Sequence, residues 1–314
     1  MKKTVSIILA ALMIVAAFVL TGCKKADDTT VRIAALKGPT GMGIAPLTNK
    51  ENYPKYDITI SSDPSAVTAS FIAGEFDIAA LPVNVAAVLY NKLEGDVVML
   101  GINTLGVLYV LEDGNEIGSI KDLAGKTLYA TGQSSTPEYV LNYLLEANGV
   151  EGVNVEYLAE HSELATLMAE GSVKLGMMPE PNVTATMVKN KDLRVALDLT
   201  EEWSKISETK LIQGVIIARR SFVKEHESVI KNFMTDYGKA VELINTASDE
   251  ACQMIVDAGI LPAAPIAKAA IPRCNIVFIT GNEMKKAATA MYEVLFDSDP
   301  KSVGGKVPGE DLYY

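Results

Sequence analysis

Two polar turns carry the residues best suited to bind a small molecule. One turn spans residues 37–42 and the other spans residues 133–136, and each follows a short apolar run. A helix is expected to begin at each turn, and the start of a helix leaves backbone N–H groups without partners and favours negative charge. Two such turns facing each other could hold a carboxylate, sulfonate, nitrate or phosphate, whereas helix capping by Thr40 and Thr136 is the alternative role. The candidate ligand-binding residues in these turns are Lys37, Pro39, Thr40, Gly41, Met42, Gln133, Ser134, Ser135 and Thr136.

A second pair of loops adds polar side chains and one carboxylate. Pro82 and Asn84 lie in one loop, and Glu180 and Asn182 lie in the other. A carboxylate at Glu180 would suit a ligand amine or ring nitrogen and would repel a simple anion. The ligand expected from this pattern is a zwitterion such as an amino sulfonate, or an aminopyrimidine, rather than nitrate. Capping is the alternative role for the two asparagines, and Thr104, after another expected strand, completes the candidate residues.

The sequence carries no motif of a catalytic, metal or cofactor site. His161 and His226 have no partner at the spacing of a zinc protease and no nearby cysteine cluster, so exposed helix positions are expected for them. Gly125-Lys126-Thr127 precedes an expected strand, whereas a phosphate-binding P-loop follows one. We therefore predict no catalytic residue, no metal and no cofactor. Trp203, the single tryptophan, is expected to pack in the core rather than stack on a ligand.

Short apolar runs alternate with helical patterns along the chain, which is typical of α/β units around a largely parallel sheet. Asp63-Pro64 and Thr136-Pro137 each place a capping residue before a proline, which marks the start of a helix. Helices are expected over 136–147, over 221–245 and through much of 248–295. The expected strands are 31–36, 58–60, 77–81, 97–101, 106–111, 126–131, 153–158, 174–178, 194–197 and 211–218.

The second half of this pattern repeats the first. Gly74 and Gly171 stand 97 positions apart, and each is followed by a buried strand, a proline and an asparagine that opens the next helix. Glu180 breaks the repeat because it stands where the first copy has Val83. The repeat predicts two doubly wound lobes with a ligand cleft at the strand ends between them. The expected parts are lobe I over 31–108 with 215–314, lobe II over 109–214, and a two-crossing hinge near 106–110 and 213–216.

The first 23 residues resemble the start of a bacterial lipoprotein. Lys2 and Lys3 precede an uncharged apolar run, and Leu20-Thr21-Gly22-Cys23 is similar to a lipobox. The expected organisation is a signal peptide over 1–22, then a lipid-carrying Cys23 and a linker to residue 30. A membrane-spanning helix is the alternative for the apolar run. The functional part is then expected outside the cytoplasmic membrane and anchored to it through Cys23.

The charge of the chain disfavours nucleic acid as a partner. There are 28 Lys and Arg against 39 Asp and Glu, a net charge of −11, which becomes −13 when Lys2 and Lys3 leave with the signal peptide. A phosphate backbone needs a concentrated basic surface, and the sequence has no basic stripe. Cys252 and Cys274 lack metal-binding spacing, so a disulfide and two buried thiols remain the alternatives for them. A monomer is expected.

Six segments carry motifs in a characteristic order, namely residues 32–43, 71–82, 122–127, 134–136, 176–181 and 304–314. This order resembles that of the solute-binding proteins of bacterial ABC importers, in the branch for nitrate, sulfonates, taurine and thiamine precursors. The resemblance implies a type II periplasmic-binding fold, whose two lobes close on a small molecule and deliver it to an ABC permease. It transfers no ligand-binding residue, so the ligand does not follow from the fold. A ligand-sensing ectodomain for a membrane signalling protein is the alternative, and an enzyme of the related pyrimidine-synthesising fold would need a catalytic histidine and metal-ligand cluster.

Overall fold

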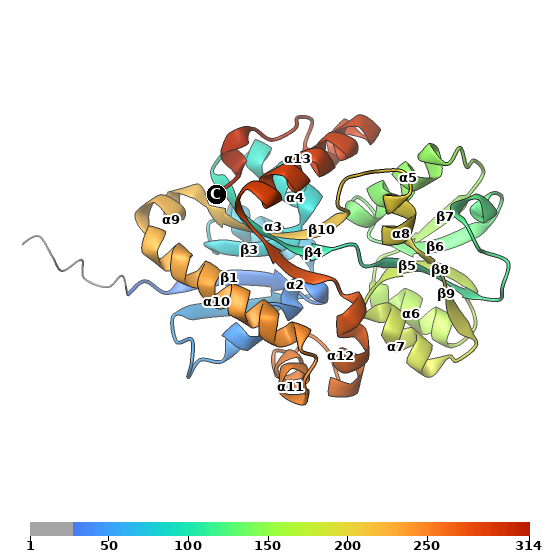
Figure 1. Cartoon of the computed structure of the whole chain (residues 1–314), viewed down its shortest axis with the longest axis horizontal. Helices are drawn as coiled ribbons and strands as arrows, with labels where there is room; N and C mark the ends of the chain where they lie inside the picture. The colour runs from blue at the N-terminus through green and yellow to red at the C-terminus, as the bar shows by residue number, and fades with distance from the viewer. Residues whose placement is uncertain (1–27) are drawn as a thin grey trace, which may run out of the picture.

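The chain folds around two separate β-sheets. The structure, a computed structural model, describes residues 28–314, so the expected signal peptide and Cys23 lie outside the described residues. Figure 1 shows the two sheets side by side, with helices packed around each of them. We call the six-stranded sheet with its helices lobe I and the five-stranded sheet with its helices lobe II. The predicted α/β class with two doubly wound lobes is confirmed.

Lobe I contains a mixed sheet in the order β11-β4-β10-β3-β1-β2. β1 pairs in parallel with β2 and β3, whereas β10 runs antiparallel to β3 and β4. β3 and β10 are buried along nearly their whole length because helices cover both faces, which explains their continuous apolar sequences. The strands are β1 (Val31–Leu36), β2 (Tyr56–Ser61), β3 (Ile78–Pro82), β4 (Val97–Leu105), β10 (Ile212–Arg219) and β11 (Ile276–Ile279).

Lobe II repeats this arrangement in the order β7-β6-β8-β5-β9. β6 pairs in parallel with β7 and β8, whereas β5 runs antiparallel to β8 and β9. Apart from β11, each strand of lobe I therefore has a counterpart in lobe II, and each sheet contains one inserted antiparallel strand, β10 or β5. The strands of lobe II are β5 (Leu108–Asp113), β6 (Thr127–Thr131), β7 (Asn154–Leu158), β8 (Leu175–Pro179) and β9 (Leu193–Asp198).

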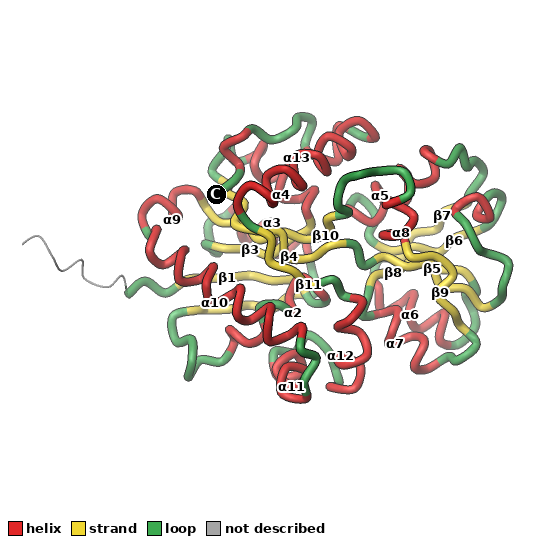
Figure 2. Tube along the Cα trace, viewed as in Figure 1, coloured by secondary structure: helices red, strands yellow, loops and turns green. Residues whose placement is uncertain are grey.

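Helices cover both faces of each sheet (Figures 1 and 2). In lobe I, α3, α4 and α13 lie on one face, and α2, α10, α11 and α12 lie on the other. In lobe II, α5 and α8 lie on one face, and α6 and α7 lie on the other. The helices are α2 (Pro39–Met42), α3 (Pro64–Ile72), α4 (Val83–Lys92), α5 (Thr136–Ala147), α6 (His161–Ala169), α7 (Asn182–Lys189), α8 (Leu199–Ser204), α9 (Arg220–Glu225), α10 (Glu227–Asn245), α11 (Asp249–Asp257), α12 (Ala264–Ala270) and α13 (Gly281–Ser298). Short 3-10 turns are η1 (Ala45–Thr48), η2 (Ile120–Leu123), η3 (Ile271–Arg273), η4 (Pro300–Val303) and η5 (Glu310–Leu312).

One cluster of buried side chains passes from lobe I into lobe II. It contains Phe71 and Met291 of lobe I together with Leu144 and Trp203 of lobe II. Trp203 is 1% exposed and packs against the ring of Tyr143, which confirms the expected packing role. The opposite faces of the two sheets have separate clusters. The lobes are thus joined by a shared apolar layer on one face.

Two elements differ from the sequence expectations. The stretch 248–295, expected to be helical, contains β11, an edge strand so short that its apolar residues look like part of a helix face. The helix expected over 221–245 is divided into α9 and α10, because His226 has φ −126° and ψ 42° and leaves the helical conformation. The expected cap at Asp63 is confirmed, since its side chain accepts from the backbone N–H groups of Ser65 and Ala66.

Cys252 and Cys274 are both buried and free, so of the two alternatives expected for them the disulfide is wrong.

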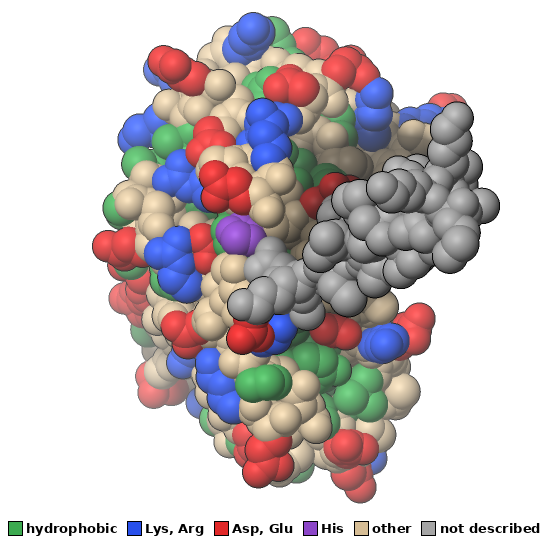
Figure 3. All heavy atoms as spheres, turned by 90° about the vertical axis from the view of Figure 1, so that its left-hand side faces the viewer, with side chains coloured by type: hydrophobic (Ala, Val, Ile, Leu, Met, Phe, Trp, Pro, Cys, Tyr) green, Lys and Arg blue, Asp and Glu red, His purple; other side chains and the backbone are tan. Residues whose placement is uncertain are grey.

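Across residues 28–314, every helix is too short or too polar to cross a membrane. Figure 3 shows the end of lobe I that lies on the left of Figure 1, where basic and acidic side chains are interspersed.

Candidate ligand-binding cleft

The carboxyl ends of parallel strands from the two lobes meet at one junction. β1, β2 and β3 end at one edge of the lobe I sheet, and β6, β7 and β8 end at one edge of the lobe II sheet. The loops after these ends touch, since a Cβ placed on Gly38 would lie 3.8 Å from Cδ of Pro181. Ligands of open α/β sheets bind at such strand ends. This junction is the candidate cleft.

A buried hydrogen bond joins the two lobes at this junction. The Thr136 hydroxyl, in the first turn of α5, donates to Oδ1 of Asn84, in the first turn of α4, over 2.9 Å. Both residues are buried. Because the bond uses the amide oxygen of Asn84, its Nδ2 group keeps its donors. Two expected site residues from opposite lobes are therefore in direct contact.

The capping roles considered for four polar residues are wrong. In each case the helix has already begun, and the N-cap position is held by a glycine, proline or serine that makes no side-chain capping bond. A proline or glycine next to the helix start moves the first turn earlier than the polar residue alone suggests. The side chains are therefore free for contacts outside their own helices. The four residues are Thr40, Asn84, Thr136 and Asn182.

A compact polar group lies at the lobe I edge of the cleft. Asn103 Nδ2 donates to the backbone carbonyl of Thr40 over 3.1 Å, and the Thr104 hydroxyl donates to Oδ1 of Asn103 over 3.2 Å. Gly214 of β10 closes this group, since a Cβ there would lie 2.6 Å from Oδ1 of Asn103. The structure thus brings Thr40 and Thr104 together around Asn103, which precedes Thr104 in the sequence.

Gln213, the residue before Gly214, has an unused donor. It is the second residue of β10, next to Gly214, which pairs with Pro82 at the end of β3. Gln213 is only 9% exposed, and its Nε2 has no hydrogen-bond partner. A buried donor without a partner lowers the stability of the folded protein by about 1–3 kcal/mol. A ligand that accepts a hydrogen bond from this donor would remove that cost. The sequence signal was a single amide in an otherwise apolar strand.

The other candidates from the first turn differ in exposure. Lys37 is exposed, whereas Pro39 is buried. Met42 is fully buried and belongs to the lobe I core. Gly41 is required by packing, because a Cβ there would lie 2.3 Å from the carbonyl oxygen of Leu36. These residues shape the turn through the backbone and the core.

In the second turn, a carboxylate of the protein itself already occupies one of the backbone N–H groups that could bind an anion. Gln133 and Ser134 are exposed, and Ser134 has a positive φ of 57°. The backbone N–H of Ser134 donates to the carboxylate of Glu138 in the first turn of α5 over 2.5 Å. A carboxylate near a helix start is stabilised by the free N–H groups there. An anionic ligand at this turn would therefore compete with Glu138.

Glu180 is fully buried and already paired. Its Oε1 accepts from Arg273 Nε over 2.6 Å and from the Thr184 hydroxyl over 2.9 Å, and Oε2 accepts from the Thr184 backbone N–H over 3.1 Å. Arg273 belongs to η3 in lobe I, so this ion pair crosses between the lobes. No local sequence signal links Arg273 to Glu180, because the two residues stand 93 positions apart.

His161 lies at the lobe II edge, at the first position of α6 after the end of β7. Like His226, it is partly buried rather than exposed, which corrects the sequence expectation for both histidines. The Nδ1 of His161 lies 2.7 Å from the hydroxyl of Thr131. Burial lowers the pKa of His161 from its usual 6.5 to about 4. The ring is therefore neutral at pH 7. In the described part of the chain, no group of three or more His, Cys, Asp or Glu is arranged to hold a metal.

A family comparison identifies the class of this protein. The model of the NMT1/THI5-like family matches residues 57–251, which is more than half of the chain. The chain belongs to this family. None of the curated proteins matches it.

Solved structures share the fold. An ABC transporter protein from Parabacteroides distasonis is 23% identical, with a TM-score of 0.78 over 91% of this chain and 99% of that one. The aliphatic sulphonate binding protein SsuA from Escherichia coli is 14% identical, with a TM-score of 0.70 over 90% of each chain. The alkanesulfonate-binding protein SsuA from Xanthomonas axonopodis pv. citri, bound to MOPS, is 14% identical, with a TM-score of 0.71 over 92% of this chain and 99% of that one. The fold is that of the periplasmic binding proteins.

Proposed function

We propose that this protein is the extracytoplasmic solute-binding component of an ABC importer, which captures a small polar molecule between its lobes and presents it to the permease. The ligand is a sulfonate-like or taurine-like anion or zwitterion, or a heterocycle similar to a thiamine precursor. The protein acts as a monomer without catalysis, and a lipid on Cys23 anchors it to the cell membrane. Family membership and the fold shared with sulfonate-binding proteins support this function.

The observation that carries the proposal is the meeting of polar strand ends from both lobes. Asn84 and Thr136 are in contact there, and Gln213 adds a buried donor without a partner. Neutral amide and hydroxyl groups of this kind can hold the oxygens of a sulfonate or the polar edge of a heterocycle. Ligand contacts to both lobes would favour the closed arrangement.

The chain connections suit a hinge motion. β4 passes into β5 through Gly106 and Val107, and α8 passes into β10 through the segment 205–211. We place the boundaries between the two bodies at these crossings, with β5, which begins at Leu108, in lobe II and β10, which begins at Ile212, in lobe I. Closure would rotate these two bodies about the crossings, as hinge proteins do.

A thermal-shift screen tests the function without knowledge of the site. Ligand binding to the folded state raises stability by about 2.7 kcal/mol at a hundredfold excess over Kd. The panel contains nitrate, alkyl and amino sulfonates, thiamine, aminopyrimidines, riboflavin and amino acids, with chloride at equal ionic strength as the control. We expect a saturable shift for one sulfonate or heterocycle, with calorimetric titration to confirm it.

The same screen can contradict the proposal. No shift from any compound, with folded protein freed of co-purified ligand, would contradict the ligand classes named here. The gene neighbourhood tests the partner independently, since adjacent permease and ATPase genes support transport and an adjacent histidine kinase gene supports sensing.

A further inference from the structure

We propose that Arg273 and Glu180 form a clamp that holds the two lobes closed, so Glu180 controls closure rather than binding a cationic group of the ligand. The inference rests on the proposed function for its biological meaning. The closure equilibrium itself can be measured without ligand.

The clamp joins a lobe II strand end to a lobe I turn. Glu180 directly follows β8, and Arg273 ends η3. The Arg273 guanidinium donates to Glu180 through Nε and to the Thr184 hydroxyl through Nη2, over 2.6 Å and 2.7 Å. One side chain from lobe I therefore satisfies two polar groups of lobe II.

The clamp lies beside the crossing from β4 to β5. The Glu180 backbone N–H donates to the Val107 carbonyl over 2.9 Å, so Glu180 is attached to the crossing itself. The Tyr109 hydroxyl donates to the Arg273 carbonyl over 3.3 Å, and Asn275 Nδ2 donates to the carbonyl of Gly106. The segment 273–275 thus contacts the crossing at several points, and the ion pair extends from this lobe I segment to the end of β8 in lobe II.

The ion pair should affect closure because the Glu180 carboxylate is buried. Glu180 is fully buried, whereas the Arg273 side chain is 39% exposed. A buried carboxylate that loses its partner is strongly destabilised, while an open cleft would let water solvate it. Removal of Arg273 therefore penalises the closed form far more than the open one. Removal of the Glu180 charge penalises it less, because water already reaches Arg273.

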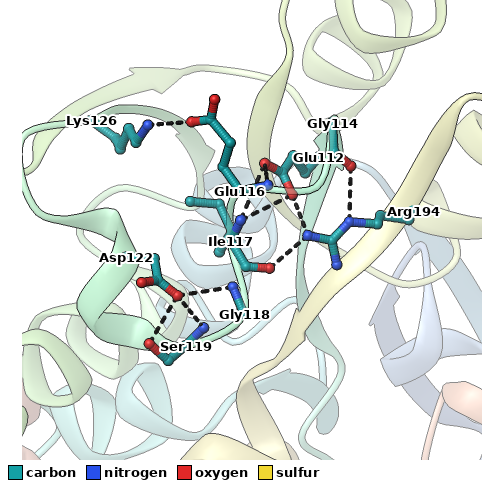
Figure 4. A network of polar contacts seen from close by, with 9 residues as sticks. All are labelled: Glu112, Gly114, Glu116, Ile117, Gly118, Ser119, Asp122, Lys126 and Arg194. Atoms are coloured by element: carbon teal, nitrogen blue, oxygen red, sulfur yellow. Dashed lines mark hydrogen bonds and ion pairs between the residues drawn. The ribbon is translucent and has the colours of Figure 1, made fainter.

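Lobe II supplies a matched control pair. Arg194 and Glu112 also combine a partly exposed arginine, at 38%, with a buried glutamate, at 7%. Figure 4 shows that Arg194 also bonds to the carbonyls of Gly114 and Ile117, while Glu112 accepts from the Ile117 N–H. All of these groups belong to lobe II. Loss of Arg194 should therefore affect the lobe and leave closure unchanged.

The experiment measures the distance between the lobes by pulsed electron spin resonance. Spin labels are attached to cysteines introduced at Ser65 and Ser162, which are exposed and lie 97 positions apart at the equivalent starts of α3 and α6. Cys23 is replaced by serine, and the buried Cys252 and Cys274 are protected from labelling. Circular dichroism melting verifies that each variant is folded. No ligand is added.

The expected results distinguish a clamp from simple packing. Arg273→Gln should raise the ratio of open to closed distances by about tenfold, and Glu180→Gln should raise it less. The double variant Glu180→Gln, Arg273→Gln should recover most of the closed population, because no charge is then left unpaired. Arg194→Gln should leave the distance distribution as in the unmodified protein.

Two results would overturn the clamp. One is an unchanged distance distribution in folded Arg273→Gln. The other is a double variant that is at least as open as Arg273→Gln, which would mean that Arg273 acts through its bulk. Either result leaves the proposed function standing, since ligand capture is tested separately by the thermal-shift screen.

Discussion

The two lobes share one topology but differ in the residues at equivalent strand ends. After β3, lobe I continues with Val83 and Asn84, whereas after β8, lobe II continues with Glu180, Pro181 and Asn182. Asn84 is buried and accepts from Thr136 of the other lobe, while Asn182 is only partly buried. Glu180 has gained a partner, Arg273, from a segment outside the repeat.

The same contrast recurs at two further positions. α3 begins with Pro64, whereas α6 begins with His161, which is bonded to Thr131. In the inserted antiparallel strands, Gly214 faces Pro82 and Leu108 faces Pro179, so Gln213 of lobe I corresponds to Val107 of lobe II. A repeated scaffold thus supplies equivalent positions, and substitutions at those positions make the polar groups of the candidate cleft. The function of such a fold depends on these substitutions rather than on the topology.

The largest expected effect is on the stability at low pH, and it comes from His161, which stands where lobe I has Pro64. Because burial lowers the pKa of His161 to about 4, the unfolded chain binds a proton between about pH 6.5 and pH 4 that the folded protein does not bind. The contribution of His161 to the free energy of unfolding is therefore fully present above pH 6.5. It decreases as the pH is lowered, by up to about 3 kcal/mol near pH 4. Urea unfolding at several pH values would measure it.

The control for this prediction is His161→Gln, which has no titrating ring. Its free energy of unfolding should lack the part of the pH dependence between pH 6.5 and 4 that His161 supplies. Parallel pH profiles for the two proteins would contradict the prediction and would remove this difference between the lobes.

A smaller effect is expected from making Gln213 resemble its lobe II counterpart Val107. Gln213→Met keeps the approximate shape and removes the buried Nε2 donor without a partner. The unliganded protein should gain about 1 kcal/mol of stability, while the thermal shift caused by the ligand identified in the screen should shrink. Thermal melts with and without that ligand measure both changes. A variant that is less stable and binds equally well would assign Gln213 to packing alone.

An effect of comparable size separates the two equivalent asparagines. Asn84→Ala removes the acceptor of the Thr136 hydroxyl and leaves that group buried, at a cost of about 1–2 kcal/mol. Asn182→Ala, at the partly buried position, should change stability by less than about 0.5 kcal/mol. Chemical denaturation of both variants measures the difference. Equal losses would break the asymmetry that we assign to the two lobes.

Much of the fold follows from local patterns. The expected strand 31–36 and the helix 136–147 have the bounds observed for β1 and α5, because apolar runs and a proline at the first turn act over a few residues. β11 was missed because a four-residue edge strand has no period that distinguishes it from a helix face. The break at His226 was missed because neither proline nor glycine marks it.

Fewer features of the candidate site than of the fold could be predicted from the sequence. The turns and strand ends were expected to meet between the lobes, and hydrogen bonds link Thr136 to Asn84 and join Thr40 and Thr104 to Asn103. Their role as ligand-binding residues stays a prediction. His161 was expected to be exposed, since nothing near it in sequence shows that Thr131 and the end of β7 bury it. Its role depends on packing between elements thirty residues apart.

The sequence by itself determined the α/β elements, their repetition in two lobes and the position of the turns at the strand ends, since these depend on the period of apolar residues and on proline and glycine nearby. Only the tertiary structure decided which polar groups find partners across the lobes. Glu180 meets Arg273, and Asn84 meets Thr136, through approaches between segments 93 and 52 positions apart. Such pairs depend on how two packed bodies meet, which no local pattern encodes.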